Sequence, residues 1–203
     1  MIFLQIIGGI FVVIVVLILL IYLYFRHKLR SCCEPDITAE PLSISLNETL
    51  SPEWLNEDNA KALISELEKV GYKPGPAYAI YEIDAVCLQP FFCPPLIAVL
   101  YKHEVAGYWI DIVVDKNGKE EYTFSNAPMG GGMDQRPECN KYFNPESTVS
   151  ELHLLAQDTI KDSEDEFLTI TESTFREYFE SAYKKEMAWK NRKGGITFEE
   201  FSK

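Results

Sequence analysis

The sequence predicts an α+β fold. A single N-terminal transmembrane helix is followed by a soluble domain in which about three helices pack on a four-stranded antiparallel meander. Three observations predict it: the first 25 residues are almost wholly apolar, segments of alternating polarity flank a hairpin signal at Asn117-Gly118, and apolar residues at helical spacing lie on both sides of these segments. The chain therefore divides into a transmembrane anchor with a basic flank (1–30), a linker (31–51) and one domain (52–203).

The segment Ile2–Phe25 is the predicted membrane anchor, because it is 24 residues long and carries no charge. As a helix it would be about 36 Å long at roughly 1.5 Å per residue, enough to cross a hydrocarbon core of about 30 Å. A cleaved signal peptide has a charged start, a shorter apolar run and a small-x-small cleavage site. Since none of these is present, the sequence predicts an anchor that is retained.

Charges beside the anchor predict its orientation. Arg26, Lys28 and Arg30 follow the apolar run, and no Lys or Arg precedes it. The positive-inside rule then predicts a single-pass protein with its N-terminus outside and its soluble domain in the cytoplasm. The glycosylation sequon at Asn47 would carry sugar only in the opposite orientation.

Two adjacent cysteines, Cys32 and Cys33, come just after the basic flank. In a eukaryotic cytosol, cysteines at this place are candidates for palmitoylation. Two unmodified thiols explain them equally well, so both interpretations stay open. The total of five cysteines is odd and contains no Cys-x-x-Cys pair, which suits a reducing compartment better than a disulfide framework.

The soluble part is strongly acidic. The chain has 19 Lys and Arg and 31 Asp and Glu, and three of the basic residues belong to the flank, so residues 31–203 carry a net charge of −15. Such a field repels phosphate backbones and anionic headgroups. The composition therefore argues against nucleic-acid binding and against a second contact with the membrane surface, while 47% apolar residues suffice for a folded core.

Local signals place the helices. Ser51-Pro52-Glu53 opens the first helix with a hydroxyl cap, a first-turn proline and an acidic residue, and Gly71 ends it. The capping box Thr148-x-x-Glu151 opens the second. A third helix is predicted from a cap at Thr171 or Ser173 to Gly194-Gly195.

Alternating polarity and β-branched or aromatic residues predict four strands: Ala77–Leu88, Leu96–Lys102, Val105–Val114 and Lys119–Ser125. The proline-rich run Gln89–Pro95 is expected to end the first strand, because proline cannot donate to a sheet ladder. Asp115–Gly118 predicts a type I′ hairpin. A short apolar segment, Phe167–Ile170, is predicted as an edge strand.

The segment Asn126–Asn144 is predicted to be irregular, because it holds three consecutive glycines with prolines nearby. The glycines lack the helix start and the Lys-Ser/Thr pair that a phosphate-binding loop needs. A mobile loop that contacts a partner is the favoured interpretation. Its candidate contact residues are Met129, Gly130, Gly131, Gly132, Met133, Asp134 and Arg136.

No catalytic residue, metal site or cofactor is predicted. The cysteines and histidines lack the paired spacing of a zinc site. The ending from Gly194 is similar to half of an EF-hand loop, but Trp189 and Lys193 stand where calcium needs oxygen ligands. A Cys-His nucleophile pair must meet in space, and no local signature indicates one. Asp111 is the one carboxylate with mostly apolar neighbours, which either a pocket or the outer face of a sheet explains.

Four stretches of the domain together resemble a group of bacterial proteins with no assigned activity. They are Leu67–Gly75, Ala98–Gly107, Tyr122–Pro128 and the pattern Tyr183-x-x-Glu186-Met187-x-Trp189. The resemblance covers most of the soluble part. It implies a bacterial source and nothing about the chemistry.

The leading hypothesis for function is a non-enzymatic module that binds a protein or ligand at a bilayer, motivated by the aromatic content and the irregular loop. Its expected partners are the lipid bilayer, through Ile2–Phe25, and an unidentified protein. The alternatives are a small membrane-anchored, hydrolase-like enzyme based on cysteine and histidine, and an accessory subunit of a membrane assembly. A cysteine and a histidine within about 4 Å of each other in a cleft would favour the enzyme.

Overall fold

The computed structural model describes residues 41–83, 86–131, 134–161, 163 and 166–194. The predicted anchor Ile2–Phe25 and the cysteines Cys32 and Cys33 lie outside these residues. Within the described ranges, no helix combines the length and apolar character needed to cross a bilayer.

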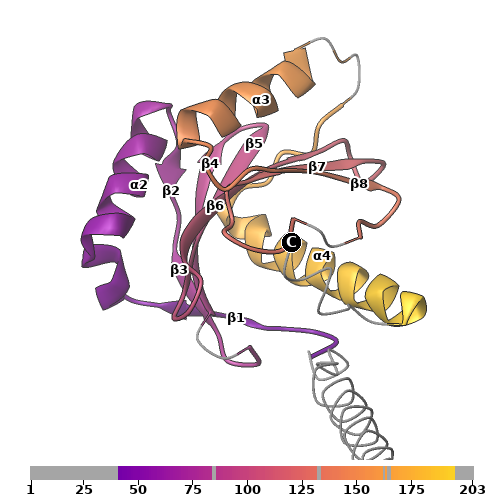
Figure 1. Cartoon of the computed structure of the whole chain (residues 1–203), viewed down its shortest axis with the longest axis horizontal. Coiled ribbons are helices and arrows are strands. Elements are labelled where there is room, and N and C mark those ends of the chain that lie inside the picture. Colours follow the sequence, from indigo (N-terminus) through magenta and orange to yellow (C-terminus); the bar gives the residue numbers. More distant parts are fainter. Residues whose placement is uncertain (1–40, 84–85, 132–133, 162, 164–165, 195–203) are drawn as a thin grey trace, which may run out of the picture. The chain divides into compact units, whose positions relative to one another are not determined.

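In its described residues the domain contains one sheet and three α-helices (Figure 1). The strands are β1 (Leu46–Thr49), β2 (Lys73–Pro74), β3 (Ala77–Ile80), β4 (Val86–Cys93), β5 (Leu96–His103), β6 (Gly107–Asp115), β7 (Glu121–Ser125) and β8 (Cys139–Phe143). The helices are α2 (Asp58–Lys69), α3 (Val149–Lys161) and α4 (Glu172–Lys193). The sheet order is β1-β3-β4-β5-β6-β7-β8, and β2 pairs with β4.

The predicted four-stranded antiparallel meander is wrong, although the α+β class holds. The sheet has eight strands and is mixed, because β8 pairs parallel to β7 while the other pairs are antiparallel. Two of the additional strands come from segments without a strand pattern: β1 from the predicted linker and β8 from the predicted irregular loop. Both are held by pairing with strands elsewhere in the chain, which local sequence does not reveal.

The sequence prediction is also wrong at β4, where proline was expected to end a strand. The predicted strand Ala77–Leu88 is divided into β3 and β4, and β4 continues through Pro90, paired with β5 along its whole length, rather than ending at Leu88. The carbonyl of Pro90 accepts a hydrogen bond from the Gly75 N–H at 2.8 Å. The nitrogen of Pro90 therefore faces the same side, away from β5, and no hydrogen bond of the β4–β5 ladder is lost.

The predicted hairpin and the ends of the later helices are confirmed. Asn117 and Gly118 both have positive φ, 51° and 76°, as a type I′ turn requires. The Thr148 N–H donates to a carboxylate oxygen of Glu151 at 2.8 Å and the Glu151 N–H donates to Thr148 Oγ1, so the capping box forms. Gly194 ends α4 in the left-handed conformation.

Two smaller predictions are wrong. The first helix is divided into a 3-10 turn at Glu53–Asn56 and α2, because Glu57 between them is extended. Phe167–Ile170 is not a strand, although the Leu168 N–H donates a hydrogen bond to the Asp115 carbonyl at the end of β6.

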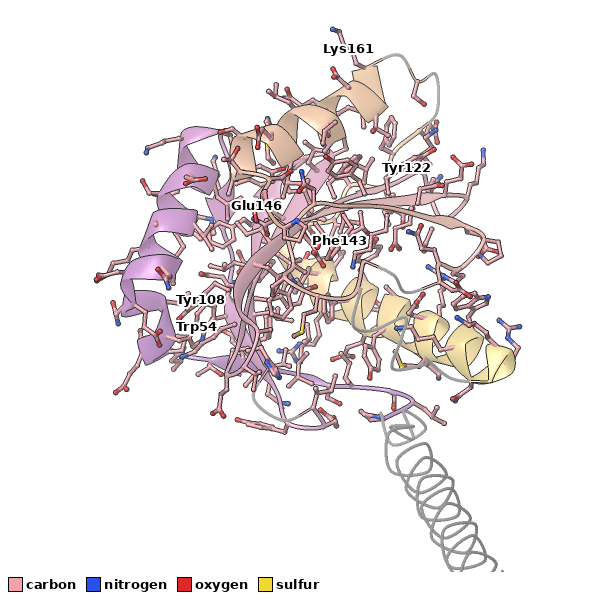
Figure 2. The ribbon with its side chains drawn as sticks, in the orientation of Figure 1. Trp54, Tyr108, Tyr122, Phe143, Glu146 and Lys161 are labelled. Carbon is pink, nitrogen blue, oxygen red and sulfur yellow. The ribbon has the colours of Figure 1, made fainter. Side chains whose placement is uncertain are left out.

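Helices cover both faces of the sheet, with α2 and α3 on one face and α4 on the other (Figure 1). The core under α2 and α3 includes the fully buried residues Leu67, Phe91, Leu100, Ile110, Ile112 and Leu152. Trp54 packs at one end of this core beside Tyr108, with ring centroids 6.3 Å apart (Figure 2). Trp54 is therefore a packing residue.

The core under α4 is apolar over only part of the sheet. Phe175 is buried there among Tyr78, Phe92 and Phe179. Further along the sheet, at β6, β7 and β8, the side chains on this face are mostly polar or charged. This change in polarity positions the candidate site.

Candidate functional site

The polar part of the α4 face follows from strand alternation. Apolar Ile110 and Ile112 point to the opposite core, so Asp111 between them points toward α4. In β7, Glu121 and Thr123 share this face, and in β8 Cys139 and Lys141 do so. Carboxylate, hydroxyl, thiol and ammonium groups thus stand on three adjacent strands beneath one helix.

These residues line a cavity of about 410 Å³ between α4 and the strands β6, β7 and β8, which we term the α4 cavity. Its volume lies within the range of small-molecule sites, about 300–1,000 Å³. The helix contributes an apolar wall that includes Phe179, Ala182, Tyr183 and Met187. The loop before β8 contributes Gly130, Gly131, Asp134, Gln135 and Arg136.

Arg136 is the centre of an ion-pair network at the edge of the cavity. Its guanidinium lies 3.8 Å from a carboxylate oxygen of Glu121 and 3.7 Å from one of Glu186. The Arg136 Nη2 also lies 2.7 Å from the sulfur of Cys139. Lys190 approaches the second oxygen of Glu186 at 3.6 Å, so α4 and the loop are joined by charge.

Glu121 is almost enclosed by this network. The Tyr178 hydroxyl donates to its Oε2 at 3.4 Å, and the Cys139 thiol lies 3.7 Å from its Oε1. Burial raises the pKa of the Glu121 carboxyl, and the nearby Arg136 guanidinium opposes the rise. Glu121 therefore has partners for both oxygens within the protein.

Asp111 differs from Glu121 in this respect. Its Oδ1 is buried and has no hydrogen-bond partner among the described residues. Burial raises the pKa of the Asp111 carboxyl, whereas Lys141 and the Ser125 hydroxyl act in the opposite direction. A buried oxygen without a partner costs roughly 1–3 kcal/mol, so Asp111 is poised to accept a hydrogen bond from something in the cavity.

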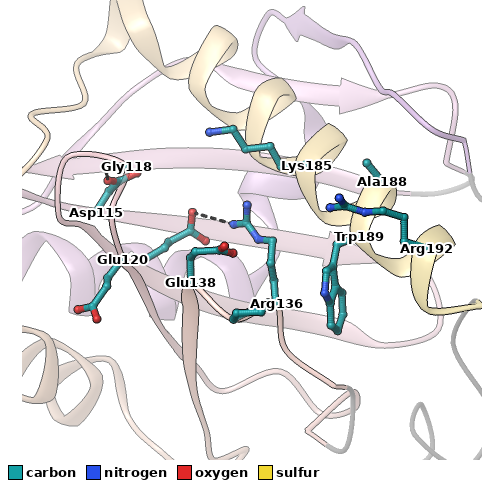
Figure 3. A pocket seen from close by; sticks show the side chains of 11 residues that line it. Asp115, Gly118, Glu120, Arg136, Glu138, Lys185, Ala188, Trp189 and Arg192 are labelled. Carbon is teal, nitrogen blue, oxygen red and sulfur yellow. Dashed lines mark hydrogen bonds and ion pairs between the residues drawn. The ribbon is translucent and has the colours of Figure 1, made fainter.

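A second hollow, which we term the outer groove, is lined in part by Arg136 (Figure 3). It has a volume of about 600 Å³ and shares Glu121 and Arg136 with the α4 cavity. Trp189, Arg192 and Lys185 of α4 face Glu138 and the hairpin residues Asp115, Gly118 and Glu120 across it (Figure 3). The dashed line in the figure marks the Arg136–Glu121 ion pair.

The structure places part of the predicted contact loop on the wall of the α4 cavity. Gly130, Gly131, Asp134 and Arg136 line it, while Met129 is 39% exposed. Gly132 and Met133 lie outside the described residues. A Cβ atom on Gly131 would collide with the ring of Phe143, so the close approach of this loop to β8 requires glycine.

Several residues of the site are not indicated by sequence reasoning. Glu121, Lys141 and Glu186 come from three different elements, and only their spacing on the folded sheet and helix brings them together. The apolar neighbours of Asp111 in the sequence left two interpretations open, a pocket or the outer face of a sheet. In the structure, Asp111 faces the α4 cavity.

Among the described residues, no hydrogen bond joins a cysteine to a histidine. His103, at the end of β5, accepts the N–H groups of Val105 and Ala106 with its Nδ1, both at 3.1 Å. His153 is buried in contact with the hydroxyl of Tyr72 at 3.3 Å, and burial lowers its pKa.

Cys139 is the one described cysteine in the polar network, and its chemistry does not suit a nucleophile. Burial and the Glu121 carboxylate raise its pKa to about 11, in spite of the adjacent Arg136. The reactive form of cysteine is the thiolate, so this group is almost entirely unreactive near neutral pH. Within the described ranges, no cluster of three or more His, Cys, Asp or Glu side chains could hold a metal ion.

Comparisons of the chain with protein-family models, with curated proteins and with solved structures find no match.

Proposed function

We propose that this protein is a non-enzymatic binding module held at a membrane by Ile2–Phe25, with its domain on the cytoplasmic side, and that its ligand binds in the α4 cavity. The anchor and its orientation are supported by the apolar run and the basic flank of the sequence. The site is supported by a cavity of small-molecule size with an apolar wall and a few convergent polar groups.

The observation that carries the proposal is the buried, unpartnered Oδ1 of Asp111. Folded proteins pair almost all buried polar atoms, and an exception calls for a specific cause. A ligand that donates a hydrogen bond to this oxygen supplies one. The cost of leaving the oxygen unpaired in the empty protein is then recovered on binding.

The cysteine-histidine enzyme has less support than the binding module. Cys139 contacts Arg136 and Glu121 rather than a histidine, and its thiol is held in the protonated form. Covalent catalysis needs a nucleophile activated by a neighbouring base or by a lowered pKa. The arrangement around Cys139 has the opposite effect.

Native mass spectrometry of the full-length chain in detergent tests the proposal. The protein is incubated with a small-molecule extract of its host cells, and retained adducts are identified. We expect an adduct on the wild type that Ala182→Trp, which fills the cavity from α4, abolishes. The matched control is Ser181→Trp, on the exposed side of the same helix, which should keep the adduct. An adduct retained by both variants, or absent from the wild type, would contradict the proposal.

A further inference from the structure

We infer that the ligand of the α4 cavity is a zwitterion of the α-amino-acid class, with its ammonium group against Asp111, its carboxylate against Lys141 and its side chain against α4. The inference rests on the proposed function, because it assigns the chemistry of the molecule bound at that site. It follows from a comparison of the charged groups that line the cavity.

Most of these charges are already paired within the protein. Arg136 pairs with Glu121 and Glu186, and Lys190 also pairs with Glu186. A third acidic residue of the lining, Asp134, lies 2.7 Å from the ammonium of Lys193. These ion pairs hold α4, the loop and the sheet together, although Arg136 Nε, 3.7 Å from Glu186, donates no hydrogen bond to a described residue.

One acidic and one basic side chain remain. Asp111 forms no ion pair with any described residue, and its Oδ1 accepts no hydrogen bond. The ammonium of Lys141 has no carboxylate partner among the described residues and lies 6.0 Å from the centre of the Phe143 ring. An unpaired carboxylate and an unpaired ammonium therefore face the same cavity.

Asp111 and Lys141 lie on strands that are not neighbours in the sheet. Asp111 lies on β6 and Lys141 on β8, with β7 between them. Two strand spacings amount to roughly 10 Å between backbones. A small molecule that carries both charges can bridge the two groups with a charge-assisted hydrogen bond at each end. An α-amino acid carries its ammonium and carboxylate on one carbon atom and supplies both bonds.

The α4 wall supplies a site for an apolar side chain. Phe179, Tyr183 and Met187 line the cavity opposite the strands, and Ile83 adds an aliphatic surface. Burial of a side chain of leucine size contributes about 1.5–3 kcal/mol. The contacts of the ligand with Asp111 and Lys141 set its orientation, and the apolar wall favours amino acids with hydrophobic side chains.

Isothermal titration calorimetry on the full-length chain in detergent tests this assignment with three matched probes. L-leucine carries both charges, isoamylamine lacks the carboxylate, and isocaproate lacks the ammonium. We expect leucine to bind at least tenfold more tightly than either analogue. Asp111→Asn and Lys141→Gln should each weaken leucine binding at least tenfold, whereas the exposed charge changes Glu172→Gln and Lys161→Gln should leave it unchanged.

The inference is overturned if leucine binds no better than both analogues, or if Asp111→Asn and Lys141→Gln bind it as the wild type does. The comparison of probes on the wild type holds even if a variant fails to fold. An adduct of another chemical class that Ala182→Trp abolishes would overturn the inference and leave the proposed function standing. Absence of any adduct would remove both.

Discussion

We expect the burial of the Asp111 carboxylate to lower the free energy of unfolding, and a substitution can measure this effect. The carboxylate must lose its water without gaining an ion-pair partner among the described residues, and ionised groups are expensive to bury. The isosteric Asp111→Asn removes the charge. We expect this variant to be more stable than the wild type at pH 7, by on the order of 1 kcal/mol, as measured by chemical unfolding. A large loss of stability would contradict this view of the site.

The pH dependence of that difference has a defined sign. The pKa of the Asp111 carboxyl is raised above its ordinary value of 3.8, so the folded state binds the proton more tightly than the unfolded state does. Below 3.8 both states are protonated and the charge contributes no penalty. The wild type should lose stability relative to Asp111→Asn as the pH rises from about 3.8, and the difference should become constant above the raised pKa.

Cys139 offers a direct test of the rival, enzymatic account. With a pKa of about 11, its thiolate is scarce at pH 8. We expect iodoacetamide to modify Cys139 at least tenfold more slowly than free glutathione at that pH, followed by peptide mass spectrometry. Modification faster than glutathione would indicate an activated thiol and revive the enzyme hypothesis.

At the scale of elements, the outer edge of β8 is closed by a side chain. The Gln135 Oε1 accepts the Lys141 N–H at 2.8 Å, and its Nε2 donates to the Lys141 carbonyl at 3.2 Å. The Cys139 N–H beside it donates to the Arg136 carbonyl. The amide of Gln135 thus takes the place that a neighbouring strand would occupy. Open edges of this kind template association between chains.

Gln135→Ala should therefore expose the edge. The lost hydrogen bonds involve exposed groups, so we expect a stability loss within about 1 kcal/mol. The larger effect should be concentration-dependent self-association, measured by sedimentation velocity in the same detergent. Gln157→Ala, at an exposed position of α3, is the matched control. Unchanged sedimentation of Gln135→Ala would show that the edge is protected by other means.

Elements with local signals were predictable and those held by distant pairing were not. The hairpin at Asn117-Gly118, the capping box at Thr148 and the glycine after α4 each depend on residues a few positions apart. In contrast, β1 pairs with β3 through contacts across about thirty residues and β8 pairs with β7 by a parallel crossover. Pro90 shows the same limit, since its tolerance depends on which side of β4 its nitrogen faces.

The whole domain determines the site in a way that no single segment does. Asp111, Lys141 and Phe179 come from β6, β8 and α4, and the strand register places the first two on one face. Strand alternation can put Asp111 on a face but cannot say whether a helix covers it. The contact loop was visible in the sequence as a run of glycines, but the cavity behind it depends on the parallel strand that follows.

The membrane anchor has its own test at this scale. We expect the full-length chain to sediment with membranes and to require detergent for extraction, and Asn47 to carry no sugar. Val16→Arg places a charge at the middle of the apolar run, which costs about 2.5–3.5 kcal/mol on insertion, and should shift protein into the soluble fraction. Val16→Leu is the control. Protein released from membranes at high pH without detergent would contradict the anchor.

The Asp111 carboxylate has a buried oxygen without a hydrogen-bond partner among the described residues, and we propose that a cationic ligand group pairs with it. Carbon-detected NMR titration of the Asp111 carboxyl group, in the full-length chain in detergent micelles, measures this most directly. Without ligand, we expect a midpoint above the ordinary value of 3.8, and saturating L-leucine should lower that midpoint. A midpoint at or below 3.8 in the ligand-free protein would show that the group is already solvated or paired, and would contradict the account.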